Sequence, residues 1–386
     1  MLCFFTMGFV DMLGIAKNHM MDDGVVSSST AYMLASLVFF WFFIFSIPTS
    51  LLMNRIGRKR TVLLSLVITL VSMVIPIFWV QSLPMMIIFF SLLGIGNTLM
   101  QTSLNPLVDI VMRGGASAST LTFGQFIKSI CSLLAPLIAK WGAMQEIPSF
   151  GLGWRILFPT YLVIGILITL LLFGTRIEEE HQPQAQKSIS EQFADAFALL
   201  VPNTKTGGAI VLLCFLAIVC HVGVDVGTNL TVPEILKERL NFTSGKADDA
   251  ILLYFIFKMI GSFSGGFIMS YLKDWTFLLV SVLMMVASVF GLIYGESTAV
   301  IYASVALMGY GNGNPFSIVF ARAMQAVPDK KNEVSGLLIM GLIGGMVFPL
   351  FMGFASDAIG QIGAVLVMAL GILYLLGYWM AGLRRK

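Results

Sequence analysis

Long apolar runs alternate with short polar breaks along almost the whole chain. A helix that crosses a bilayer needs about 20 predominantly apolar residues, and most of these runs provide them. Glycines, prolines and small charge clusters separate the runs. The pattern predicts an all-α membrane protein with twelve transmembrane helices, at about 1–19, 30–53, 61–80, 84–112, 117–140, 154–175, 206–232, 249–272, 275–295, 297–325, 333–356 and 361–382.

One polar stretch near the middle of the chain is much longer than the other breaks. It covers residues 176–205 and contains three consecutive glutamates at 178–180, followed by a glutamine-rich run. Such a composition is typical of a linker between two folded parts. We therefore expect an N-terminal six-helix half at 1–175, a cytoplasmic linker at 176–205 and a C-terminal six-helix half at 206–386.

Short motifs recur in the two halves at a nearly constant offset. The sequence Leu-Leu-Gly-Ile-Gly-Asn at 92–97 resembles Leu-Met-Gly-Tyr-Gly-Asn at 307–312, and Val10-Asp11 resembles Val224-Asp225. A constant offset is expected of two structural repeats that run in parallel. Two such halves around a central site are the architecture of a transporter.

Composition and charge exclude several classes of protein. With 58% hydrophobic residues, 11% charged residues and a mean hydropathy of +0.91, the chain is far too apolar for a soluble globular protein. The net charge of +3 gives no support for a nucleic-acid partner. The four cysteines lie in apolar runs without metal-ligand spacing, and no cluster of His, Cys and Asp suggests catalysis. We expect no enzymatic activity, no cofactor and no bound metal.

The basic residues predict the orientation in the membrane. Most of the 23 Lys and Arg residues fall on the side that holds both termini and the linker, and this side is therefore expected to be cytoplasmic. The first 16 residues have no basic start and no convincing cleavage site, so we read them as a retained helix whose true start lies here or upstream. These features favour the inner (plasma) membrane of a bacterium.

The loop after the second span carries the first recognisable motif. It reads Asn54-Arg55-Ile56-Gly57-Arg58-Lys59-Arg60 and resembles the Asp-Arg-x-Gly-Arg-Arg/Lys signature of the major facilitator superfamily. The resemblance implies that Asn54, Arg55, Gly57 and Arg58 form the gating loop of that fold. Asn54 replaces the usual aspartate, and this puts the salt bridge attributed to that aspartate in doubt.

Within the superfamily, scattered motifs resemble the fucose–proton symporter family, which also contains glucose/galactose transporters. The sharpest are Asp11, the run Gln101-Thr102-Ser103-Leu104-Asn105-Pro106 and the pair Gly124-Gln125. The resemblance implies proton-coupled symport of a hexose or 6-deoxyhexose by alternating access, through a central cavity of a single chain. Three alternatives stay open: an acidic sugar or other organic anion, sodium coupling, and efflux of organic compounds.

The resemblance assigns the coupling proton to Asp11. A carboxylate within an apolar helix can alternate between its charged and neutral forms as access to it switches; the alternative is that Asp11 only pairs with a nearby cation or caps a kink. Gln101 stands where the fucose transporters carry Glu; its amide can contact sugar hydroxyls but cannot titrate. Asn97 shares the helix face of Gln101, and Asn105-Pro106 suggests either a substrate contact or a kink.

Three further charges lie inside predicted spans and do not follow the fucose pattern. Unpaired ions are costly in a bilayer, so we expect Lys128 to pair with Asp11 or Asp225, or Lys258 to pair with Asp225. A lysine in the site would equally suit a carboxylate substrate. His221 and Asn229 lie on the helix face of Asp225.

The remaining candidates are less specific. Asn312 and Asn314 are either site residues or polar contacts between helices, Asp109 is expected to pair with Arg113, and Trp41 and Tyr254 are candidates to stack on a sugar. The candidate substrate-binding residues are Gln101, Asn97, Asn105, Gln125, Lys128, Asp225, Asn229, Asn312 and Asn314.

Overall fold

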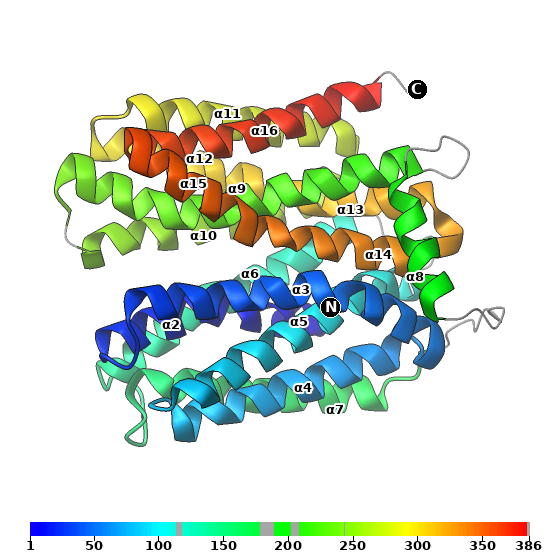
Figure 1. Cartoon of the computed structure of the whole chain (residues 1–386), viewed down its shortest axis with the longest axis horizontal. Coiled ribbons are helices and arrows are strands. Elements are labelled where there is room, and N and C mark those ends of the chain that lie inside the picture. The colour runs from blue at the N-terminus through cyan, green and yellow to red at the C-terminus, as the bar shows by residue number, and fades with distance from the viewer. Residues whose placement is uncertain (113–117, 178–188, 202–207, 243, 384–386) are drawn as a thin grey trace. The chain divides into compact units, whose positions relative to one another are not determined.

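The computed structural model describes residues 1–112, 118–177, 189–201, 208–242 and 244–383 (Figure 1). Every regular element in these ranges is a helix. Ten of the described helices are long and apolar enough to cross a membrane, and they coincide with ten of the twelve expected spans. The all-α prediction is confirmed, and the other two spans, near 1–19 and 297–325, are each broken in the middle.

These two spans are interrupted in different ways, and the span at 333–356 also contains a 3₁₀ turn, η5 (Gly341–Ile343). In the first, α1 (Leu2–Met7) passes through the 3₁₀ turn η1 (Gly8–Asp11) into α2 (Met12–Asp22). In the later one, α12 (Thr298–Asn312) stops before α13 (Pro315–Ala326), because proline cannot donate the backbone hydrogen bond that would continue the helix. Both breaks therefore place backbone irregularities beside polar side chains, Asp11 in one case and Asn312 in the other.

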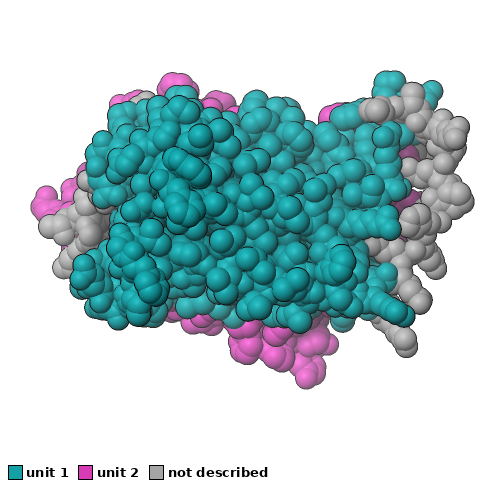
Figure 2. All heavy atoms as spheres, turned by 90° about the horizontal axis from the view of Figure 1, so that it is seen from below, with its two compact units in different colours: residues 1–115, 127–196, 335–340 teal, residues 116–126, 197–334, 341–386 magenta. Residues whose placement is uncertain are grey.

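The chain separates into two compact units, which Figure 2 shows in teal and magenta. Unit 1 comprises residues 1–115, 127–196 and 335–340. Its further elements are α3 (Ser28–Ile56), α4 (Arg58–Trp79), α5 (Leu83–Val111), most of α6 (Ala118–Ala143), η2 (Gly153–Ile156), α7 (Leu157–Gly174) and α8 (Ile189–Phe197). Within it α5 packs against α3 and α4, and α4 packs against α7, as Figure 1 shows.

Unit 2 comprises residues 116–126, 197–334 and 341–386. Its further elements are η3 (Ala198–Leu200), α9 (Gly208–Leu240), α10 (Ser244–Ile268), α11 (Asp274–Tyr294), η4 (Pro328–Lys330), part of α14 (Lys331–Met340), η5 (Gly341–Ile343), α15 (Gly344–Ile359) and α16 (Gln361–Leu383). Within it α9 packs against α15 and α16, and α12 packs against α10 and α11. The exact limits of the two six-helix halves stay a prediction.

The linker is described only around α8, because residues 178–188 and 202–207 lie outside the described ranges. Arg113 lies outside them too, and so does its expected pairing with Asp109. Several of the basic residues that predict the orientation, such as Lys205, also lie outside the described ranges.

Apolar side chains on the outside of the helices show which surface meets lipid. On α7, Leu167, Leu170 and Leu171 are each more than half exposed, whereas Tyr161 on the opposite face is fully buried. A helix at the surface of a soluble protein would turn polar residues outward at these positions. Together with the ten apolar spans, this surface makes the chain an integral membrane protein.

Candidate functional site

The break in the first span brings Asp11 against α6. Gly8 lies so close to α6 that an added Cβ would sit 2.8 Å from the Cβ of Cys131 and 2.8 Å from the carbonyl oxygen of Lys128. Only a residue without a side chain permits this approach. The turn that follows places Asp11 just before α2, with its carboxylate directed at two side chains of α6.

These two side chains are a serine and a lysine. The hydroxyl of Ser132 donates a short hydrogen bond to Oδ2 of Asp11, and Nζ of Lys128 lies 3.9 Å from the same oxygen. The side chains of Lys128 and Asp11 keep 20% and 26% of their surface exposed. The expected pairing of Lys128 with Asp11 is confirmed. Sequence reasoning missed Ser132, although it lies one helical turn after Lys128 and therefore on the same face.

Asn97 and Gln101 connect α5 to the broken first span. The amide of Gln101 donates to Oδ1 of Asn97 at 2.7 Å, and the amide of Asn97 donates to the backbone oxygen of Met7 at 2.9 Å. Met7 is the last residue of α1. The shared helix face is confirmed, and in this structure the two amides support the turn that carries Asp11.

Asn105 and Pro106 continue α5 rather than end it. Proline has no N–H, so the Thr102 carbonyl four residues earlier loses its helical donor. The hydroxyl of Ser335 donates to that carbonyl at 2.7 Å, and the amide of Asn105 donates to the Gln101 carbonyl at 3.0 Å. The carbonyl released by the proline is therefore satisfied by a protein side chain.

A second polar cluster surrounds Asp225 in unit 2. Nζ of Lys258, on α10, lies 2.7 Å from both carboxylate oxygens of Asp225, on α9. The hydroxyl of Tyr254 donates a short hydrogen bond to Oδ1, and the amide of Asn312 donates to the same oxygen at 3.1 Å. The expected pairing of Asp225 with Lys258 is confirmed, and Asn312 belongs to this site.

Tyr254 has a different position from that expected of a stacking residue. Only 1% of its surface is exposed, and its hydroxyl accepts a hydrogen bond from Asn312 at 2.8 Å. In this structure its ring is closed to a sugar, and the residue serves the Asp225 cluster. Trp41 is half-buried and packs beside Gly94 on α5.

The other candidates lie near the two clusters or between helices. The amide of Asn229 donates to the backbone oxygen of Asp225 at 2.8 Å, and His221 is buried one turn before Asp225. Gln125 is half-buried on α6, one turn before Lys128. Asn314 donates to the Tyr310 carbonyl at 3.4 Å, and its side chain fills the space above Gly265, so it is a packing residue here.

The basic loop forms a tight connection between α3 and α4. Gly57 has a φ of 88°, a value that residues with a side chain rarely adopt, and this permits α4 to begin at Arg58 directly after α3. The ammonium of Lys59 donates to the carbonyls of Phe173 at 3.2 Å and Thr175 at 2.6 Å. A lysine thus caps the C-terminus of α7, where the helix dipole favours a positive charge.

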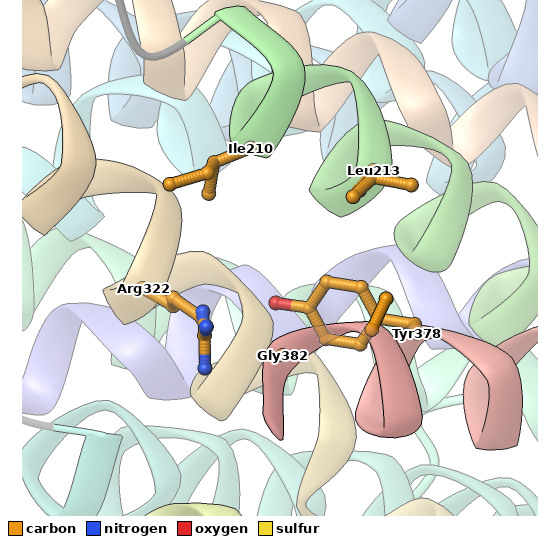
Figure 3. Close-up of a pocket in the computed structure, with 6 residues that line it drawn as sticks. Ile210, Leu213, Arg322, Tyr378 and Gly382 are labelled. Atoms are coloured by element: carbon orange, nitrogen blue, oxygen red, sulfur yellow. The ribbon is translucent and has the colours of Figure 1, made fainter. Parts of the chain in front are cut away.

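One small pocket lies in unit 2, between α9, α13 and α16 (Figure 3). Arg322 and Tyr378 line it together with Ile210 and Leu213, as the figure shows. The guanidinium of Arg322 lies 3.9 Å from the centre of the Trp275 ring. None of the predicted site residues lines this pocket.

Intramembrane carboxylates with lysine partners are candidate functional sites of a membrane protein, and ion and substrate pathways of transporters contain such residues. The sequence model of the Major Facilitator Superfamily matches residues 1–341, and the chain belongs to that family. The superfamily prediction is confirmed.

The chain is similar to curated transporters in sequence and to a solved transporter structure in fold. A "Glucose/galactose transporter" of Brucella abortus is 23% identical over 389 residues, which cover 99% of this chain and 92% of the relative. The "L-fucose-proton symporter" of Escherichia coli is 20% identical over 365 residues, which cover 86% of this chain and 80% of the relative. The outward structure of FucP matches with a TM-score of 0.80 at 17% identity, over 98% of this chain and 97% of that one.

Proposed function

We propose that this protein is a secondary active transporter. It carries a sugar, a hexose or 6-deoxyhexose, together with a proton by alternating access. The observation that carries the proposal is the setting of Asp11. It is a carboxylate in the break of an apolar span, with one hydrogen bond from Ser132 and a lysine at 3.9 Å. The similarity to a glucose/galactose transporter and to an L-fucose-proton symporter supports the sugar and the proton.

In this mechanism, Asp11 takes up the proton from the outer side and releases it to the inner side. Protonation removes the charge that holds Lys128, so the two protonation states of Asp11 differ in their local contacts. Protonated Asp11 favours substrate binding in the outward state. Release of sugar and proton inside permits the empty carrier to return.

The setting of Asp11 favours a proton over sodium as the coupling ion. A sodium ion beside Asp11 would lie close to the ammonium of Lys128 and be repelled by it, whereas a proton neutralises the carboxylate without needing a shell of oxygen ligands. Asp225 is less suited to this role because Lys258, Tyr254 and Asn312 all donate to its charged form.

The remaining assignments complete the proposal. The residues that line or support the substrate path are Gln101, Asn97, Asn105, Gln125, Asn229 and Asn312. The gating loop consists of Asn54, Arg55, Gly57 and Arg58. Beside it, Lys59 connects α4 to the end of α7. The relatives are bacterial, which supports a bacterial inner membrane, and the excess of basic residues on one side supports cytoplasmic termini. We propose that a single chain is sufficient for transport.

Reconstituted transport tests this function. The full chain is placed in liposomes with an acidic outside, and uptake of labelled D-glucose, D-galactose, L-fucose, D-glucuronate and D-galacturonate is followed with and without sodium. The proposal expects accumulation of at least one sugar that collapses when a protonophore dissipates the gradient. Accumulation that requires sodium, or that is inhibited only by lipophilic cations, would overturn it.

A further inference from the structure

The two intramembrane lysines have very different partners. Lys258 makes hydrogen bonds of 2.7 Å to both oxygens of Asp225. The ammonium of Lys128 donates no hydrogen bond to the described residues, and its one ionic contact among them is Oδ2 of Asp11 at 3.9 Å. An ammonium has three donors. Those of Lys258 are largely occupied, whereas those of Lys128 are available to a ligand.

Lys128 keeps part of its side chain exposed. The exposed fraction is 20%, nearly the same as the 19% of Lys258, so the two lysines differ in their contacts and not in their exposure. The oxygen of Asp11 that it approaches also accepts a hydrogen bond from the hydroxyl of Ser132. A lysine held only at this distance from its counter-ion is unusual for a bilayer, where charges are normally tightly paired.

The charge of this cluster changes when Asp11 is protonated. With Asp11 ionised, the pair with Lys128 is neutral. Once a proton binds to the carboxylate, the positive charge of Lys128 has no partner among the neighbours of Asp11. Cys131 on α6 and Tyr161 on α7 also interact with Asp11, and neither supplies an anion at neutral pH.

We propose that Lys128 is the specificity residue for a carboxylate on the sugar, and that the substrate class is therefore the hexose acids, such as the hexuronates. The inference rests on the proposed proton-coupled sugar transport and adds the charge of the substrate to it. Protonation of Asp11 releases Lys128, and the carboxylate of the sugar replaces Asp11 as the partner of the ammonium. The proton resides on Asp11, and no covalent bond changes.

Two consequences distinguish this mechanism from transport of a neutral sugar. Proton binding raises the affinity for the anion, and by reciprocity the anion raises the affinity for the proton. One proton moves with one monoanion, so the translocated charge is zero. Uptake is then insensitive to the membrane potential and responds only to the pH gradient.

The test uses the full chain in liposomes with a fixed pH gradient and a potential clamped by potassium and valinomycin. Labelled D-glucuronate and D-galacturonate are compared with D-glucose, D-galactose and L-fucose, in the native protein and in Lys128→Gln and Lys128→Arg. The inference expects saturable uptake of a uronate that does not change with the clamped potential. Lys128→Gln lowers the apparent affinity for the uronate about 10- to 100-fold, as expected for the loss of a hydrogen bond to a charged group. Lys128→Arg recovers part of it.

The matched control is Lys140→Gln on the same helix. Lys140 is exposed near the end of α6 and has no salt bridge to the described residues. Uronate uptake by the Lys140→Gln variant should therefore equal that of the native protein. If Lys128→Gln fails to fold, the comparison of uronates with neutral sugars in the native protein still tests the inference. Proton-driven uptake of a neutral sugar, with no uptake of or competition by either uronate, overturns this inference and leaves the proposed function intact. Absence of proton-driven uptake for both classes overturns both.

Discussion

Lys258 holds Asp225 by contacts of 2.7 Å to both of its carboxylate oxygens, and so joins α10 to α9. The side chains are 19% and 23% exposed, and Tyr254 and Asn312 add further donors around the carboxylate. This is the geometry of a part-buried pair whose carboxylate accepts several hydrogen bonds. Its parallel in unit 1, Asp11 with Lys128, is much looser.

The tight pair predicts a large loss of stability when one partner is removed. Lys258→Gln leaves the carboxylate of Asp225 without its counter-ion and is expected to cost about 2 to 4 kcal/mol of unfolding free energy. Thermal melting of the purified protein in detergent measures the change. The double variant Asp225→Asn with Lys258→Gln is the control, since it leaves no unpaired charge and should recover part of the loss. If it melts at or below the temperature of Lys258→Gln, the pair does not stabilise the fold in this way.

Asp11→Asn is expected to separate proton coupling from sugar movement. The amide keeps the size of the carboxylate but cannot take up a proton at these pH values. Accumulation driven by a pH gradient should disappear, while exchange of labelled for unlabelled sugar at equal pH continues. In the native protein the rate of uptake falls as the external pH rises, because the proton is a co-substrate; in Asp11→Asn this dependence is flat.

A matched substitution controls for the loss of a carboxylate as such. Asp357, on α15, is exposed and forms no salt bridge within the described part of the chain, so Asp357→Asn keeps both accumulation and its pH dependence. Retained gradient-driven accumulation in Asp11→Asn would show that another group carries the proton.

Gly311→Ala is expected to disturb the contact between α12 and α11. An added Cβ would lie 2.6 Å from the Ser281 carbonyl and 2.8 Å from Cγ of Met285, so the two helices must separate. Overpacking of this kind costs about 1 to 3 kcal/mol. Gly377→Ala on α16 has no atom within 4 Å of the new Cβ and should melt like the native protein. Equal melting of the two variants would contradict the close approach.

Ser335→Ala tests the hydrogen bond that replaces the donor lost at Pro106. Removal of the hydroxyl leaves the Thr102 carbonyl without this partner and should cost about 1 kcal/mol. In a Pro106→Ala background the new N–H at position 106 can donate to Thr102, so the cost of Ser335→Ala should shrink. A double-mutant cycle on the unfolding free energy measures the difference. Additive effects would show that the two positions do not share this carbonyl.

Sequence reasoning reached the class of this protein because the relevant signals are local. Apolar runs of spanning length, the basic Asn54–Arg60 loop and the repeated Gly-x-Gly-Asn motif each depend on neighbours in the chain. The bilayer enforces them directly, since every spanning segment must satisfy its own backbone. The pairing of buried charges followed from the same constraint, and both pairs formed are among those expected.

The tertiary structure decided the features that depend on residues far apart in the chain. The break of the first span depends on how closely Gly8 approaches α6 and on the amide of Asn97, which reaches Met7 from a distant helix. The roles of Ser132, Tyr254 and Ser335 depend on which helices pack together. The difference between the two lysines has the same origin: each can reach a carboxylate, but only the packing of α9 against α10 sets the contact at 2.7 Å, whereas the path of the first span leaves Lys128 at 3.9 Å from Asp11.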